Sequence, residues 1–252
     1  MSDIVDEQKV AKAAKAAGKG GRMPSTSTEL KAGAKLSRPE FERRYCAHPN
    51  LKKAELVDGI VRMPSPVRYV QHARPHTALL ELLILYAKRT PGVGAVSNAS
   101  VRLDSRTEVQ PDALLRIESA ELGQSVVDAD GYITGAPELV AEVSASSARF
   151  DLREKLDAYL RNGVREYIVW QTLAGRIDWF ERVEGTFRPL PTTTGGVVSS
   201  RVFPGLRLEP EAMVAEDDAR ALAAARAGLG SAAHLEFIAS LGGQPITSET
   251  AG

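Results

Sequence analysis

Three acidic residues lie in otherwise apolar segments, where ionised side chains are uncommon. Glu55 stands in "AELVDG", Asp112 in "QPDALL" and Glu142 in "PELVAEVSASS". A carboxylate in such a segment needs a cation, a metal ion or exposure at the end of a strand. Each residue alone is consistent with a solvated strand end. Together they predict a site that uses carboxylates for chemistry.

Asp112 and Glu142 are the candidate metal ligands. If they lie on adjacent strands, their like charges at about 4 Å repel by roughly 4 kcal/mol at an effective dielectric near 20. A divalent cation between them would remove that cost, and Mg²⁺ favours oxygen ligands while needing only one or two carboxylates. Lys155, in the helix that follows the Glu142 strand, could supply the positive charge instead, or could be a solvated helix residue.

The acidic residues depend on strands for their positions. The segment "AELVDGIVRM" has two short apolar runs around Asp58-Gly59, a pair that favours the tight turn of a hairpin, so Glu55 falls on its first strand. Strands are also predicted in "VGAVSNASVRLD", in "VQPDALLRIE" and over residues 137–144, with a second hairpin in "VVDADGYI". The segments "REYIVW", "RIDWFER" and "TFRPL" are predicted to follow as strands.

Helices are predicted between these strands. The apolar spacing from Arg74 to Lys88 is helical, and Ser37 is suited to cap a short helix. Asp151 followed by Glu154 has the spacing of a capping box, which predicts a helix over residues 152–162 that stops at Gly163. The order of elements indicates an α+β fold around one sheet.

Length and composition indicate one large domain with tails. Of the 252 residues, 43% are apolar, which is enough for a sizeable core. We expect a disordered basic arm over residues 1–36, the domain itself over 37–210, and a C-terminal helix with a flexible tail over 211–252. The single Cys46 and the absence of a secretory or membrane-spanning segment favour a cytoplasmic protein. The net charge of zero gives no overall basic signature for nucleic acid.

Five segments carry a family resemblance. They are "AELVDG", "MPSP" with a histidine nearby, "QPDALL", "PELVAEVSASS" and "FDLREKLDAYLRNGVREYIVW". Over residues 37–210 the chain resembles the bacterial Uma family of restriction-endonuclease-like proteins, which belongs to the PD-(D/E)XK nuclease superfamily. The resemblance implies a restriction-endonuclease-like core, with a central mixed β-sheet flanked by helices.

The resemblance also implies a site and an activity. Metal-binding carboxylates fall on Asp112 and Glu142, with Glu55 as an additional acid. The superfamily's lysine usually stands two residues after the second acid, where this chain has Ser144, and Uma-like sequences carry a lysine at the position of Lys155. The implied function is hydrolysis of DNA phosphodiester bonds by an endonuclease using Mg²⁺ or Mn²⁺ and a metal-activated water, with a homodimer plausible by analogy. The alternative is a catalytically inactive module of the same fold that binds nucleic acid or protein.

Further polar residues could support this site. Gln110 could contact a metal-bound water or a phosphate, or hydrogen-bond to the backbone. His72 and His76 have the i, i+4 spacing of zinc ligands but lack the glutamate of an H-E-x-x-H pattern, so zinc is disfavoured and His76 is a candidate substrate contact, as is the hydroxyl of Ser144. Tyr159 falls one turn after the helix lysine and is expected to support it or to pack in the core.

Overall fold

The computed structural model describes residues 28–64, 66–145, 147 and 150–244, so residues 1–27 of the predicted arm lie outside it. The sheet that carries the candidate site has six strands in the described part. Their spatial order is β12 (Thr186–Pro189), β11 (Arg176–Val183), β10 (Glu166–Gln171), β9 (Leu139–Ser144), β6 (Ala113–Ile117) and β3 (Val93–Ser97). β9 and β10 are parallel, and the other neighbours are antiparallel. The predicted α+β class is confirmed.

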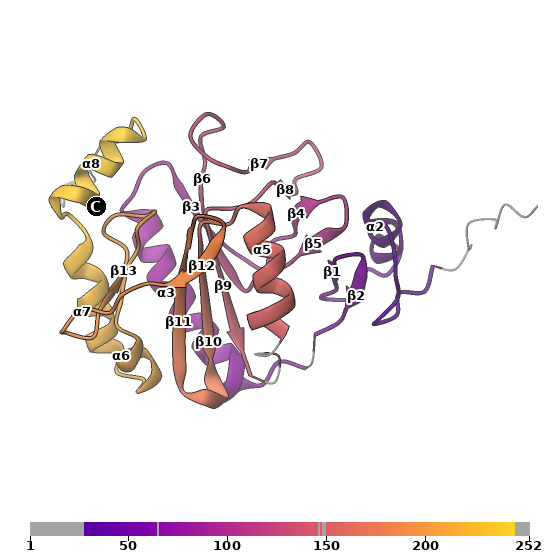
Figure 1. The fold of residues 1–252 in the computed structure, drawn as a ribbon, viewed down its shortest axis with the longest axis horizontal. Coiled ribbons are helices and arrows are strands. Elements are labelled where there is room, and N and C mark those ends of the chain that lie inside the picture. Colours follow the sequence, from indigo (N-terminus) through magenta and orange to yellow (C-terminus); the bar gives the residue numbers. More distant parts are fainter. Residues whose placement is uncertain (1–27, 65, 146, 148–149, 245–252) are drawn as a thin grey trace, which may run out of the picture.

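Helices cover both faces of this sheet (Figure 1). Because side chains alternate along a strand, Val143 of β9 packs with helix α3 (Arg74–Lys88) on one face, and Val140 packs with helix α5 (Leu156–Asn162) on the other. The helix over residues 74–88 was predicted with these bounds and is confirmed. The polar residue Glu142 shares the even-numbered positions of Val140, so it faces α5.

A second sheet lies beside the first. Its order in the described part is β2 (Ile60–Arg62), β1 (Glu55–Val57), β5 (Thr107–Val109), β4 (Val101–Asp104), β8 (Ile133–Thr134) and β7 (Val126–Val127). The predicted hairpin is confirmed, since Asp58 and Gly59 have φ angles of 51° and 77° between β1 and β2. The strands therefore divide between two sheets where the sequence predicted one. The chain passes from the second sheet to the first through Gln110 and Pro111, and Pro111 has no N–H to continue a ladder.

The predicted arm is too long at its C-terminal end. Leu30 is buried beside Phe41 of helix α2 (Arg38–Cys46), and Lys35 forms a β-bridge with Ile60. Residues 28–36 therefore belong to the folded part of the chain. Leu30 and Leu36 pack in this cluster, and backbone hydrogen bonds to Gly59 and Val61 hold the segment against β2.

The helix predicted after β9 begins differently from the prediction. Residues Asp151–Lys155 form a π-helical turn, η2, that leads into α5, and Gly163 ends α5 with a φ of 89° as predicted. The predicted capping box is wrong. Phe150 is already helical, so Asp151 does not stand at the N-cap of the helix, and the Asp151 carboxylate accepts the Ser144 hydroxyl instead. A second π-helical turn, η1 (Tyr69–Ala73), leads into α3.

Three helices follow where the sequence predicted one. They are α6 (Pro210–Val214), α7 (Asp218–Gly228) and α8 (Ala232–Ser240), and before them β13 (Val198–Ser199) pairs with β14 (Arg207–Leu208). The break after α6 falls at Glu216, whose φ is 60°, and the break after α7 falls at Gly230, whose φ is 77°. Residues 245–252 lie outside the described part. No described helix is long and apolar enough to cross a membrane.

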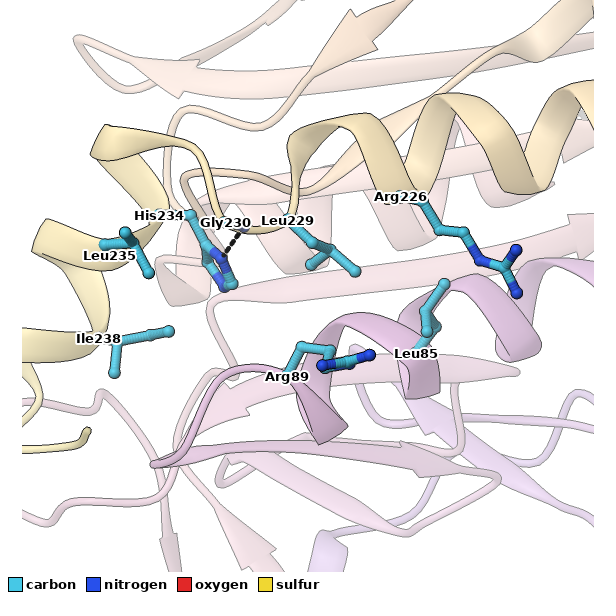
Figure 2. Close-up of a pocket in the computed structure, with 8 residues that line it drawn as sticks. All are labelled: Leu85, Arg89, Arg226, Leu229, Gly230, His234, Leu235 and Ile238. Atoms are coloured by element: carbon cyan, nitrogen blue, oxygen red, sulfur yellow. Dashed lines mark hydrogen bonds between the residues drawn. The ribbon is translucent and has the colours of Figure 1, made fainter. Parts of the chain in front are cut away.

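A pocket of about 440 Å³ lies between α3, α7 and α8 (Figure 2). Arg89 and Arg226 border it, and His234 lines it while accepting a hydrogen bond from the Gly230 N–H at Nδ1. Arg89 follows the last residue of α3, whereas His76 lies in its first turn. At 1.5 Å per residue, the pocket is therefore about 20 Å along the helix from the candidate site.

Candidate active site

The two proposed metal ligands lie on the same face of the sheet. Ala113 pairs with Ala141 on antiparallel strands, so Asp112 and Glu142 occupy the next opposed positions. Asp112 Oδ2 accepts a hydrogen bond of 2.8 Å from the backbone N–H of Val143, which holds the Asp112 carboxylate across the gap between the strands. Both carboxylates therefore sit at the end of the sheet where β6 begins and β9 ends.

Lys155 joins two of the three predicted acids. Its Nζ lies 2.7 Å from Glu142 Oε1 and 2.9 Å from Glu55 Oε1. Glu55 reaches this position from β1 of the second sheet, and its Oε1 also accepts the Gln110 backbone N–H at 2.8 Å. The lysine side chain is only 3% exposed, so its charge is neutralised by these carboxylates and not by solvent. The π-helical turn η2 is the element that carries the lysine to this point.

Tyr159, in α5, contacts the same carboxylate as Lys155. Its hydroxyl donates to Glu142 Oε1 at 2.8 Å, and its ring packs against Tyr167 with centroids 5.0 Å apart. Tyr159 is fully buried, so it contacts the Glu142 carboxylate from the protein core. Because Lys155 and Tyr159 both donate to Oε1, Glu142 Oε2 is left clear of these two donors.

Two residues that the sequence analysis did not assign to Asp112 contact its carboxylate. Lys53 Nζ lies 3.2 Å from Oδ1, and His72 Nε2 lies 3.1 Å from Oδ2. Burial alone would raise the pKa of Asp112, but the His72 hydrogen bond, the Lys53 charge and the Val143 N–H together outweigh it and hold that pKa below its ordinary value. Asp112 is therefore ionised. Lys53 keeps 20% of its side chain exposed, far more than Lys155.

His76 and Gln110 hold the backbone around Asp112 in place. His76 Nε2 lies 2.8 Å from the carbonyl oxygen of Asp112 and 3.2 Å from Ser97 Oγ. The Gln110 side-chain amide donates to the hydroxyls of Tyr45 and Ser100 at 3.1 and 3.0 Å. Both side chains are thus engaged with protein groups.

Ser144 lies two residues after Glu142, at the end of β9. Its hydroxyl donates to Asp151, a buried carboxylate of η2. Burial raises the pKa of Asp151, while Lys155 and the Ser144 hydroxyl oppose that rise. Asp151 is thus a fourth acidic group that interacts with the charge of Lys155.

Glu142 and Lys155 form a buried ion pair with unequal partners. Burial, together with the charges of Asp112 and Asp151, raises the pKa of Glu142 to about 8 against the opposing charge of Lys155. Burial would lower the pKa of Lys155, but Glu142, Glu55 and Asp151 outweigh that effect and raise it well above its ordinary value. Lys155 therefore stays positively charged. Glu142 is the partner whose ionised form is disfavoured by burial and by the neighbouring carboxylates.

The donor set fits a metal that needs few protein ligands. In the described residues no group of three or more histidine, cysteine and acidic side chains is arranged to hold a metal ion, as a zinc site would require. His72 and His76 both direct Nε2 at Asp112, one at its carboxylate and one at its carbonyl. Two carboxylates on one face, Asp112 and Glu142, match the small set of oxygen ligands that Mg²⁺ takes from protein.

A family model and a solved structure match this chain. Residues 38–211 match the Uma2 family, which is described as "Putative restriction endonuclease". Among solved structures, the chain is similar to one from Anabaena variabilis described as "a putative nuclease", with a TM-score of 0.47 and 12% identity over 60% of this chain and 83% of that chain. Among curated proteins there is no match.

Proposed function

Because the chain belongs to the Uma2 family, we propose that it is a metal-dependent endonuclease that hydrolyses DNA phosphodiester bonds with a water nucleophile. One observation carries this proposal. Asp112 and Glu142 face the same side of the sheet from adjacent strands, and Lys155 reaches the second of them at 2.7 Å. Two carboxylates can hold the metal, and a lysine beside them can orient the water, for metal-assisted attack on a phosphodiester.

Asp112 and Glu142 are the residues that would hold Mg²⁺ or Mn²⁺. When bound, the metal would act as a Lewis acid on the phosphate and lower the pKa of a coordinated water. Asp112 is suited to this role because His72 and Lys53 keep it ionised. Glu142 is suited because its Oε2 is clear of the Lys155 and Tyr159 donors.

Lys155 positions the acids and the water. An ammonium group has three N–H donors, and Glu142 and Glu55 take two of them. In the described residues the third has no carboxylate partner, and it would orient an attacking water beside the Glu142 carboxylate. In this arrangement Lys155 does the work of the lysine that the strand lacks at Ser144, and Glu55 fixes the direction of the ammonium.

Lys53 is the cation placed nearest to solvent. It contacts Asp112 at 3.2 Å with a fifth of its side chain exposed, so a phosphate oxygen could approach it without displacing the buried ion pair. Positive charge at this point would stabilise the negative charge that builds on the phosphate during attack. We therefore propose that Lys155 orients the attacking water and that Lys53 contacts the phosphate.

A plasmid-nicking assay with Mg²⁺ or Mn²⁺ tests the proposal. Wild-type protein should convert supercoiled plasmid to nicked or linear DNA, and Asp112→Asn should lose about 100-fold or more in rate because the variant keeps the shape but not the charge of the ligand. Asp130→Asn is the matched control, since Asp130 is a 74% exposed aspartate in the turn between β7 and β8 and not one of the carboxylates of the site.

Two results would contradict the proposed nuclease function. One is the absence of cleavage by wild-type protein with either metal, on supercoiled, linear and single-stranded DNA. The other is equal cleavage by wild-type protein and Asp112→Asn, which would identify a contaminant. If wild-type protein binds DNA or a protein without cleaving, the interaction-module alternative replaces the proposal.

A further inference from the structure

Four large apolar side chains are exposed together at the edge of the candidate site. Val67, Tyr69 and Val70 precede or lie within η1, and Leu173 lies in the 3₁₀ turn η3 (Thr172–Ala174) between β10 and β11. They are 65, 71, 63 and 70% exposed. We call these four residues the rim patch. The largest apolar patch on a monomer is often functional.

Hydrogen bonds connect both halves of the rim patch to the metal-ligand strands. His72, in the same π-helical turn as Tyr69, bonds the Asp112 carboxylate at 3.1 Å. The Thr172 hydroxyl lies 2.8 Å from the carbonyl oxygen of Gln71 and 3.2 Å from that of Ser144, two residues after the second ligand. The turn between β10 and β11 accordingly lies beside the start of α3 (Figure 1). A molecule on the rim patch is thus adjacent to the carboxylates.

From this placement we infer that the rim patch binds unpaired bases, so that the substrate is a single-stranded segment of DNA; the inference rests on the proposed nuclease function. Tyr69 offers an exposed aromatic face for stacking, and the aliphatic side chains beside it cover the rest of a base. In a duplex the faces of the bases are already stacked on one another. Arg68, between Val67 and Tyr69, is exposed and can neutralise a phosphate.

A second copy of this chain is the main competing occupant. Four side chains amount to a few hundred Å², the size of a functional patch on a monomer. Each partner of a standard protein interface buries about 800 Å². The rim patch is therefore large enough for one or two bases and too small to hold a stable dimer alone.

Fluorescence anisotropy with labelled oligonucleotides in EDTA tests the inference without cleavage. Wild-type protein should bind a single-stranded oligonucleotide more tightly than a duplex of the same sequence. Tyr69→Ala should weaken single-strand binding by about 5- to 150-fold, the range expected for loss of one stacking aromatic, while Tyr69→Phe keeps the ring and should bind like wild type. Leu122→Ala is the matched control, because Leu122 is a 52% exposed leucine outside the rim patch.

The outcomes separate this inference from the nuclease proposal. Single-strand binding that depends on Tyr69, without any cleavage in metal, would uphold the rim patch and overturn only the nuclease. Cleavage by wild-type protein with equal oligonucleotide binding by Tyr69→Ala would overturn only the rim patch, as would a preference for duplex. A dimer in sedimentation velocity that dissociates in Tyr69→Ala would also overturn it, in favour of a second copy. Because Tyr69 is exposed, Tyr69→Ala should leave the unfolding midpoint unchanged.

Discussion

Replacing Lys155 by methionine tests the buried ion pairs most directly. Methionine keeps much of the packing of the lysine stem and none of its charge. At an effective dielectric near 20, each contact of Lys155, at 2.7 Å to Glu142 and 2.9 Å to Glu55, is worth about 6 kcal/mol before the cost of desolvation. Removing one partner of a buried pair typically costs about 3–5 kcal/mol, because the remaining charge stays buried without a partner. For a chain of this size, that cost lowers the melting temperature by about 6–20 °C.

Urea unfolding followed by circular dichroism at pH 8 and pH 5 provides the measurement. Burial raises the pKa of Glu142 to about 8, so its protonated form is the one favoured in the fold, and a protonated carboxyl needs no cation. The deficit of Lys155→Met should therefore be largest at pH 8 and shrink at pH 5. Lys52→Met is the control, because Lys52 is an exposed lysine on the neighbouring segment. A loss below about 1 kcal/mol at both pH values, equal to that of Lys52→Met, would refute the ion-pair geometry.

Two other outcomes follow from buried acids. Millimolar Mg²⁺ or Mn²⁺ should raise the unfolding midpoint of wild-type protein by mass action on the folded state, and Glu142→Gln should reduce that rise; an equal rise in both proteins, measured by differential scanning fluorimetry, would place the metal elsewhere. Burial, reinforced by Glu42, raises the pKa of Glu108 to about 8, and its Oε2 is buried without a hydrogen-bond partner in the described residues. Its contribution to stability is therefore fully present below about pH 4.5 and is lost as the pH rises through about 8. Glu108→Gln should remove that loss, which is on the order of a few kcal/mol, and parallel unfolding curves of the two proteins between pH 5 and pH 9 would contradict it.

Local chemistry explains the parts of the fold that the sequence predicts correctly. The hairpin at Asp58-Gly59 depends on two positive φ angles, and these residue types adopt them readily. The helix from Arg74 to Lys88 depends on its own apolar spacing, and α5 ends at Gly163 because glycine adopts the left-handed conformation. Each of these features is specified within a few residues of where it occurs.

The parts that the sequence analysis missed depend on contacts and turns that no local motif marks. Lys53 and His72 reach Asp112 across 59 and 40 residues, and neither has a motif that assigns it to an acid. Asp151 does not cap a helix, since Phe150 before it is already helical, and its carboxylate accepts the hydroxyl of Ser144 from the end of β9. The π-helical turns that carry His72 and Lys155 also have no marker in local spacing. Such turns are rare and occur often at functional sites, so their position beside both acids is itself consistent with chemistry there.

The charge balance of the site explains why a divalent cation suits it. Glu55, Asp112, Glu142 and Asp151 supply four carboxylates, and two ammonium groups, those of Lys53 and Lys155, face them. With every acid ionised and His72 neutral, two negative charges remain, which equals the charge of one Mg²⁺. Without a metal the excess falls on Glu142, whose pKa is raised to about 8, and this matches its place between the other acids. Screening by a monovalent salt acts mainly on exposed charges, so NaCl at matched ionic strength cannot substitute for an ion bound among these buried groups.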